Sequence, residues 1–206
     1  IGDNGTGSNS QSLSTFKGKM LRLNSDGTIP TDNPFYDDGN PKTGNDDRIW
    51  AMGLRNSFDF CFSPLNDSIY ATENSPGNPD EINFIRKGKN YGWPVCTGFC
   101  FPYNPLYKNP MTGLPGNDFS NYAPTGIMIY TGTLMPELTD KLLVIGSGGG
   151  QVFRGLVKCD LGNPPFNDTI NSKTILLDIT GTTLMQGSDG YIYIMRISQG
   201  LIGRLK

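Results

Sequence analysis

Short apolar segments recur along the chain, and their alternation predicts strands. Near the C-terminus, Ile192 and Ile194 face one side of an extended segment, and Tyr191 and Tyr193 face the other. Two apolar faces are typical of a strand whose sheet packs on both sides. The segments predicted as strands are 19–24, 58–63, 68–72, 81–86, 126–130, 141–145, 151–158, 173–179 and 191–196. The only helical turn expected lies near 135–140, so the pattern predicts an all-β fold.

Turn pairs recur at a regular interval, and an alternating apolar strand is expected after each of them. The pairs begin at Asp26, Asp67 and Asp189; the first two lie 41 positions apart and the last two 122, close to three times that interval. A period of about 40–45 residues is typical of β-propeller blades. Chance recurrence of common turn pairs is the alternative. At this period the chain holds about four to five blades of a single partial domain, 1–206, with a Pro-rich insertion at about 101–124.

Composition supports a turn-rich β protein and narrows its partners. Gly 27 and Pro 15 make up about a fifth of the chain, and charged residues only 17%, as expected for many short strands joined by turns. The net charge of −2 gives no electrostatic case for binding nucleic acid or an anionic membrane surface. No apolar run approaches the roughly 20 residues of a membrane span.

Several features fit an exported protein. The chain begins at Ile1 and not at Met, which is compatible with a processed chain or an excerpt whose secretion signal is absent. Acceptor sequences for N-glycosylation begin at Asn4, Asn66 and Asn167. We therefore expect an extracellular, periplasmic or cell-surface location.

The four cysteines predict one disulfide. Cys96 and Cys100 close a tight loop, and without any histidine or a second closely spaced pair a zinc site is not favoured. We therefore expect a Cys96–Cys100 bridge. Cys61 and Cys159 form either a second bridge or two buried thiols.

The stretch 72–94, reading TENSPGNPDEINFIRKGKNYGWP, concentrates oxygen donors. Calcium takes about 6–8 oxygen ligands, from carboxylates and from backbone carbonyls exposed in turns. Residues that could supply them are Ser75, Pro76, Asp80, Glu81 and Tyr91. The alternative is a polar loop whose acids cap turns or meet Arg86 and Lys87.

Together with other motifs, this stretch resembles a known family. The motifs are GKMLRLNSDGTIPTDNPF at 18–35, GLRN at 53–56, APTGIMIYTG at 123–132 and GSDGYIYIM at 187–195. In this order they resemble the soluble quinoprotein glucose and aldose sugar dehydrogenases, which are glucose/sorbosone dehydrogenase-like proteins. The resemblance implies a six-bladed β-propeller that binds calcium and, in active members, pyrroloquinoline quinone (PQQ).

The resemblance also assigns cofactor contacts to the GLRN motif. Arg55 matches the family arginine that lies against the cofactor, and Asn56 follows it as in the family. A guanidinium can pair with a carboxylate through two hydrogen bonds. A structural ion pair of Arg55 with Asp59 or Asp47 is the alternative.

Calcium positions follow from the same comparison. Ser75 and Pro76 occupy positions whose backbone carbonyls hold the cofactor-bound calcium in the family. The carboxylate of Glu81 and the carbonyl of Tyr91 match a structural calcium site, and Asp80 is expected to assist directly or through water.

The chain departs from the family at several cofactor positions. It contains no histidine, so no catalytic residue is assigned to it, and the family's general base is expected upstream of Ile1. Asn74 stands where many relatives have a histidine. Neutral residues occupy the positions of a family lysine and two arginines: Gly148 or Ser147, Thr180 and Thr182. Buried carboxylates without charged partners are unfavourable, which argues against tight binding of a quinone with three carboxylates.

Two functional hypotheses follow. The chain belongs to a PQQ-dependent dehydrogenase that oxidises aldose sugars by hydride transfer, or to a non-catalytic extracellular propeller that binds carbohydrate or protein as an assembly module. Because an open propeller exposes strand edges, we expect upstream sequence or a neighbouring copy to complete it. Aromatic residues expected to be exposed for sugar or protein contact are Tyr91, Trp93, Phe101, Tyr103, Tyr107 and Tyr122.

Overall fold

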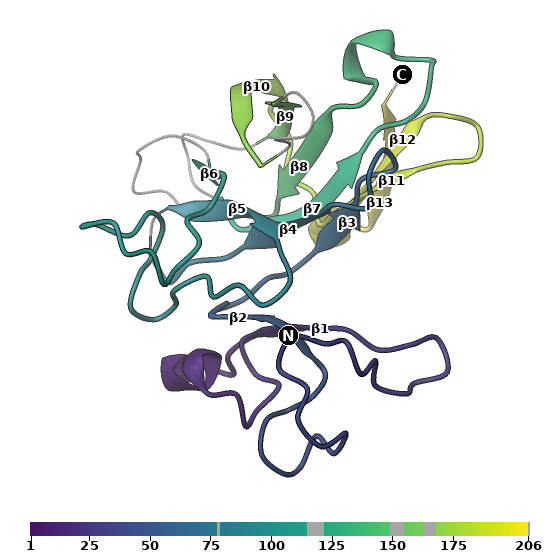
Figure 1. The fold of residues 1–206 in the computed structure, drawn as a ribbon. Helices are drawn as coiled ribbons and strands as arrows, with labels where there is room; N and C mark the ends of the chain where they lie inside the picture. Colours follow the sequence, from purple (N-terminus) through teal and green to yellow (C-terminus); the bar gives the residue numbers. More distant parts are fainter. Residues whose placement is uncertain (78, 115–121, 149–154, 163–167, 206) are drawn as a thin grey trace. The chain divides into compact units, whose positions relative to one another are not determined.

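The regular secondary structure is almost entirely β-strand, as the sequence predicts, and long loops connect the strands. A computed structural model describes residues 1–77, 79–114, 122–148, 155–162 and 168–205 (Figure 1). Their strands form four antiparallel sheets, in the orders β1-β2, β3-β4-β5-β6, β10-β9-β8-β7 and β11-β12-β13. The strands are β1 Lys19–Leu21, β2 Ile49–Met52, β3 Phe60–Phe62, β4 Ile69–Glu73, β5 Asp80–Ile85, β6 Thr112–Leu114, β7 Pro124–Ile129, β8 Leu142–Gly146, β9 Leu156–Leu161, β10 Ile170–Leu177, β11 Thr183–Gln186, β12 Ile192–Arg196 and β13 Leu201–Leu205.

Helical structure in the described residues is limited to short 3-10 turns. These are Gly7–Gln11, Pro136–Leu138 and Ile197–Gln199. The second confirms the turn predicted near 135–140, and the other two show that the expectation of a single helical turn is wrong. No helix within the described ranges has the length and apolar character needed to cross a membrane.

The chain divides into two compact units. The N-terminal unit comprises Ile1–Ser57 and Ile85–Pro110, and the C-terminal unit comprises Phe58–Phe84 and Met111–Lys206. The single-domain interpretation and the number of blades stay predictions. The proposed insertion at 101–124 contains β6, which pairs with β5, so part of it belongs to a sheet; residues 115–121 lie outside the described ranges.

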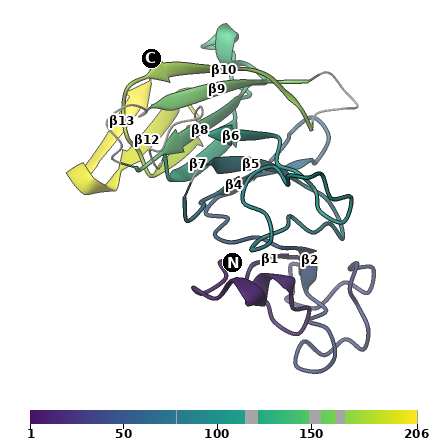
Figure 2. The same ribbon diagram turned by 90° about the vertical axis from the view of Figure 1, so that its left-hand side faces the viewer.

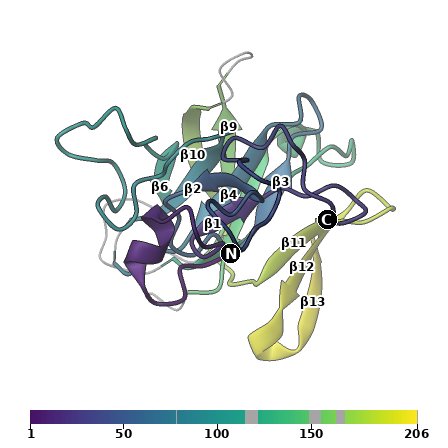
Figure 3. The same ribbon diagram turned by 60° about the horizontal axis from the view of Figure 1, so that its bottom comes forward.

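Within the C-terminal unit, the sheet β7–β10 is buried on both faces. Ile127 and Ile129 of β7 join one core cluster, whereas Met128 and the following Tyr130 join another. Successive side chains of a strand point to opposite faces, which explains why this segment is apolar at every position. β3 and β4 pack against β7, while β7 and β8 pack against β11. Figure 2 shows the sheet of β7–β10, and Figure 3 shows β11, β12 and β13 side by side.

Most predicted strands are confirmed, with shifted ends. The sequence missed β2, β6, β11 and β13, and residues 151–154 of the predicted strand 151–158 lie outside the described ranges. The strand expected after Asp26 is wrong, because residues 29–48 form turns and loops. Pro30 and Pro34 interrupt this segment, and proline cannot donate a ladder hydrogen bond.

The cysteine prediction is confirmed for one pair. Cys96 and Cys100 form a disulfide, whereas Cys61 and Cys159 are free, so a second bridge is excluded. The two free thiols pack in the same hydrophobic cluster. Burial raises the pKa of Cys61 and of Cys159 to about 12.

Apolar side chains are exposed on the outer strands of two sheets. Phe60 and Phe62 on β3 are 48% and 58% exposed, and Leu201 and Ile202 on β13 are 55% and 69% exposed. β3 and β13 each end a sheet. These end strands therefore carry apolar side chains that the described residues leave exposed.

Candidate functional site

The GLRN motif leaves β2 through a bend that requires glycine. Gly53 has φ +75°, and a Cβ atom built on it would lie 2.1 Å from Asn90 Oδ1. The Gly53 N–H donates to Ser10 O at 2.9 Å, and its carbonyl accepts from Trp93 N–H at 3.0 Å. These contacts fix the direction in which the backbone continues from Gly53 to Arg55.

A hollow of about 570 Å³, the Arg55 hollow, opens beside this motif in the N-terminal unit. Arg55, Asn56, Asp3 and Lys17 are among the residues that line it. The Arg55 guanidinium carbon lies 5.9 Å from the centroid of the Trp93 ring, whose Nε1–H donates to Asp3 Oδ2 at 2.8 Å. Two cationic side chains in an open hollow suit a carboxylate ligand. Sequence reasoning identified Arg55 and Asn56 but missed Lys17 and Asp3.

Arg55 does not form the structural ion pair with Asp47 that the sequence left open as an alternative. Asp47 makes no ion pair within the described part of the chain. Asp59, the other proposed partner, belongs to the C-terminal unit, where its Oδ2 accepts the Ile127 N–H at 3.0 Å. Burial raises the pKa of Asp59.

In the C-terminal unit, the Asp80 carboxylate holds the turn between β4 and β5. Its Oδ1 accepts the Ser75 N–H and its Oδ2 accepts the Ala123 N–H, both at 2.8 Å. Asp80 is fully buried, and Asn74 Nδ2 donates to Pro124 O at 2.9 Å. This geometry favours a structural role for Asp80; its part in metal binding stays a prediction.

Glu81 lies beside a buried acceptor that sequence reasoning missed. Glu81 is 7% exposed, and its Oε2 accepts Asn83 Nδ2–H at 3.2 Å. Asn83 is fully buried, and its Oδ1 has no hydrogen-bond partner in the described residues. Residues two apart on a strand share a face, so this neighbour could have been found from the spacing alone. A carboxylate beside an unsatisfied amide oxygen is compatible with a hard cation.

Tyr91, the other residue predicted at this calcium site, belongs to the N-terminal unit. It is 6% exposed, its hydroxyl accepts the Arg86 N–H at 3.0 Å, and its own N–H donates to Met52 O at 2.9 Å. Burial raises the pKa of the Tyr91 phenol. Its coordination together with Glu81 stays a prediction.

A second hollow, of about 310 Å³, gathers residues far apart in the sequence. Thr125, Ser147, Thr180, Thr182 and Arg196 of the C-terminal unit are among those that line it. This Arg196 hollow brings together Ser147, Thr180 and Thr182, the neutral residues predicted to stand at positions of family cations. It also adds a guanidinium that sequence reasoning did not assign.

Arg196 is positioned to meet an anion. Its Nε–H donates to Thr180 O at 3.1 Å, and no carboxylate lies within ion-pair distance of it in the described ranges. The signal was present in the alternation of β12, because Arg196 follows Ile192 and Ile194, which are buried. A polar residue at the end of the buried face of a strand commonly marks the edge of the hydrophobic core.

The Arg196 hollow and the turn held by Asp80 are connected through the first residues of β7. Pro124 accepts the hydrogen bond from Asn74, and the next residue, Thr125, lines the hollow and donates to Gly181 O at 3.2 Å. Ser75 and Pro76, predicted to hold a cofactor-bound calcium, lie in this turn. Ser75 is 6% exposed, and Pro76 is exposed.

The predicted group of exposed aromatic residues is only partly correct. Tyr91 is buried, and Tyr122 is 2% exposed with its hydroxyl donating to Val144 O and Gly155 O at 3.1 and 2.6 Å. Phe101 and Tyr103 are exposed.

Comparison with known proteins gives a consistent result. Residues 1–202 match the family model described as Glucose / Sorbosone dehydrogenase. The aldose sugar dehydrogenase YliI of Escherichia coli strain K12 is 37% identical over 205 residues, which cover 95% of this chain and 52% of that protein.

Solved structures show the same fold. The apo form of the soluble aldose sugar dehydrogenase from Escherichia coli matches with a TM-score of 0.75 and 26% identity, over 94% of this chain and 55% of that one. The PQQ-bound form of aldose sugar dehydrogenase from Streptomyces coelicolor matches with a TM-score of 0.72 and 21% identity, over 98% and 55%. This chain therefore spans about half the length of these relatives.

Proposed function

Since this chain belongs to the glucose/sorbosone dehydrogenase family, we propose that it forms the calcium-binding and cofactor-holding part of a quinone-dependent dehydrogenase acting on aldose sugars. The chain spans 52% of the related aldose sugar dehydrogenase, so the activity is proposed for the whole protein. The part that we propose for this chain is to bind calcium and the cofactor and to orient the cofactor.

The observation that carries this proposal is the composition of the Arg196 hollow. Ser147, Thr180 and Thr182 were aligned with cofactor-binding positions, and all three line the same hollow. Thr180 and Thr182 are neighbours in sequence, so the informative observation is that Ser147, more than 30 positions away, lines the hollow with them. Arg196 supplies a cation that the aligned positions themselves lack, so a carboxylate in the hollow would have a charged partner.

Several residues would hold the cofactor and calcium. Arg55 and Arg196 would each bind a carboxylate in their own unit, and the carbonyls of Ser75 and Pro76 would bind the calcium next to the cofactor. Glu81, with the Tyr91 carbonyl, would bind a structural calcium. When bound, PQQ would accept the hydride of the sugar. The chain contains no histidine, so we assign proton removal to none of its residues.

An extracytoplasmic location fits this role. Disulfides persist mainly in oxidising compartments, and Cys96 and Cys100 form one. Asn4 and Asn66, two of the predicted glycosylation sites, are exposed, whereas Asn167 lies outside the described ranges.

The proposal is tested by adding calcium and PQQ to the chain and measuring quinone binding from its absorbance, followed by dye reduction with aldoses. Arg196→Met is expected to weaken quinone binding by about tenfold or more, because a charge-assisted hydrogen bond is lost. Arg204→Met is the matched control, since Arg204 lies on the adjacent strand and meets Asp189 at 3.8 Å.

Unchanged quinone affinity in Arg196→Met would remove Arg196 from the binding residues. No binding by the wild-type chain at micromolar quinone would overturn the proposal, and would favour a non-catalytic module that binds carbohydrate or protein.

A further inference from the structure

Three acidic side chains come together in the long loop between β1 and β2. Asp37, Asp38 and Asp47 each offer one carboxylate oxygen, and these oxygens lie within 4.8 Å of one another. Oxygen ligands about 2.3–2.6 Å from one calcium ion lie at most about 5 Å apart. The spacing of the three oxygens is therefore compatible with a shared ion.

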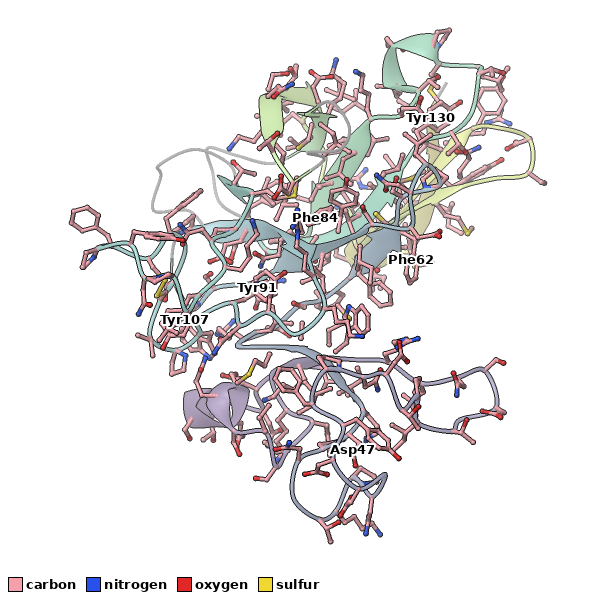
Figure 4. All side chains as sticks on the ribbon, viewed as in Figure 1. Asp47, Phe62, Phe84, Tyr91, Tyr107 and Tyr130 are labelled. Atoms are coloured by element: carbon pink, nitrogen blue, oxygen red, sulfur yellow. A yellow bond between two sulfur atoms is a disulfide. The ribbon has the colours of Figure 1, made fainter. Side chains whose placement is uncertain are left out.

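Asp47 adds an independent observation, because part of its carboxylate is buried without a partner. Asp47 has no exposed surface, and Figure 4 labels it among the loops of the N-terminal unit. Its Oδ1 accepts the Asp37 N–H, but its Oδ2 has no hydrogen-bond partner in the described part of the chain. A buried carboxylate oxygen without a donor is unfavourable unless a cation meets it.

No side chain of the described residues supplies that cation. Arg48, the nearest arginine in sequence, binds Asp46 through both carboxylate oxygens, at 2.8 and 2.7 Å. None of the three carboxylates forms an ion pair within the described ranges. Within these ranges, no cationic side chain compensates the charge of the cluster.

The loop already holds the outer two carboxylates in place. Asp37 Oδ2 accepts the Asn45 N–H at 2.8 Å. Asp38 accepts the Asn40 N–H at 2.8 Å and the Thr43 hydroxyl at 2.6 Å. Each carboxylate oxygen can accept more than one interaction, so these bonds orient the groups and leave lone pairs for an ion.

We propose that Asp37, Asp38 and Asp47 bind a calcium ion that fastens the loop between β1 and β2. The ligands are hard carboxylate oxygens on an irregular loop, and calcium accepts such variable geometry whereas magnesium requires a near-ideal octahedron. This site is separate from the calcium positions proposed at Ser75, Pro76, Glu81 and Tyr91, and does not depend on the quinone.

The test is calcium binding by the chelator-treated chain, measured by equilibrium dialysis and calorimetry with calcium alone. Asp38→Asn and Asp47→Asn are each expected to remove one bound calcium per chain, or to weaken one site by about tenfold or more, because one anionic ligand is lost. Asp26→Asn is the matched control, since Asp26 is an exposed acid of the same loop.

Glu81→Gln separates this site from the others, because it should leave the site affected by Asp47→Asn intact. The proposal is overturned if Asp38→Asn binds as many calcium ions as the wild type with equal affinity, or if Asp26→Asn loses as much binding. Asp38 is exposed, so this variant decides the question even if Asp47→Asn fails to fold.

Discussion

Replacing Asp80 with asparagine should destabilise the C-terminal unit strongly. Asp80 is fully buried, and its two oxygens accept the N–H groups of Ser75 and Ala123, both at 2.8 Å. Asparagine has nearly the same shape but offers only one acceptor. Its NH₂ group would face a backbone N–H, which places two donors against each other.

The expected loss follows from these two hydrogen bonds. A hydrogen bond to a charged group contributes about 1.5–3 kcal/mol, whereas a neutral one contributes about 1 kcal/mol, and a buried donor left unsatisfied costs about 1–3 kcal/mol. One bond is weakened and the other is lost, so Asp80→Asn should lower the free energy of unfolding by about 2–4 kcal/mol. This is a large fraction of the roughly 5–15 kcal/mol typical of a domain.

The assay is urea denaturation followed by circular dichroism, with chelator and again with calcium. Asp67→Asn is the matched control: Asp67 is exposed in the same unit, its φ of 55° suits asparagine, and the change should stay within about 0.5 kcal/mol. A purely structural Asp80 predicts the same loss in both conditions. A loss below about 1 kcal/mol refutes the hydrogen-bond reasoning, and a loss seen only with calcium would show that Asp80 acts through the metal.

Two further outcomes are expected. Gly53→Ala should lower the free energy of unfolding by more than about 2 kcal/mol in urea denaturation, because the new Cβ would lie 2.1 Å from Asn90 Oδ1. Gly27→Ala is the control: Gly27 also has positive φ but has open space around it, so this change should lower the free energy of unfolding by about 1 kcal/mol. Equal losses in the two variants would contradict this account. Burial disfavours the thiolate and raises the pKa of Cys61 and of Cys159 to about 12, against the ordinary 9.0. At pH 9 about one thiol in a thousand is then ionised, so both cysteines should resist alkylation by iodoacetamide. Rapid labelling of the native chain, detected by mass spectrometry, would contradict the burial.

The sequence predicted strands best where burial alone determines them. The segments around Ile127 and Val144 are apolar at successive positions because the sheet β7–β10 has a core on each face. Thr112–Leu114 could not be recognised in this way, because β6 is a short strand whose conformation depends on pairing with β5. The loop after Asp26 shows the opposite error, since a common turn pair does not ensure that a strand follows.

The candidate site was predictable only in part, because strand pairing also decides which residues reach it. Motif resemblance identified Arg55 and the positions of Thr180 and Thr182. Arg196 was missed because its place in the hollow depends on pairing between β12 and its neighbours and on the Thr180 carbonyl. Single positions in an alignment cannot show that a cation from another strand lines the same hollow.

The buried polar groups of the chain differ in what their oxygens accept, and this difference separates structural roles from cation-binding ones. Both oxygens of Asp80 accept backbone N–H groups, so folding itself satisfies the carboxylate. Asp47 Oδ2 and Asn83 Oδ1 are equally buried but accept no hydrogen bond in the described residues. A protein retains such acceptors at a loss of stability unless something absent from the polypeptide meets them. Calcium should therefore stabilise the chain through Asp47 and through Glu81 beside Asn83, while the contribution of Asp80 stays independent of the ion.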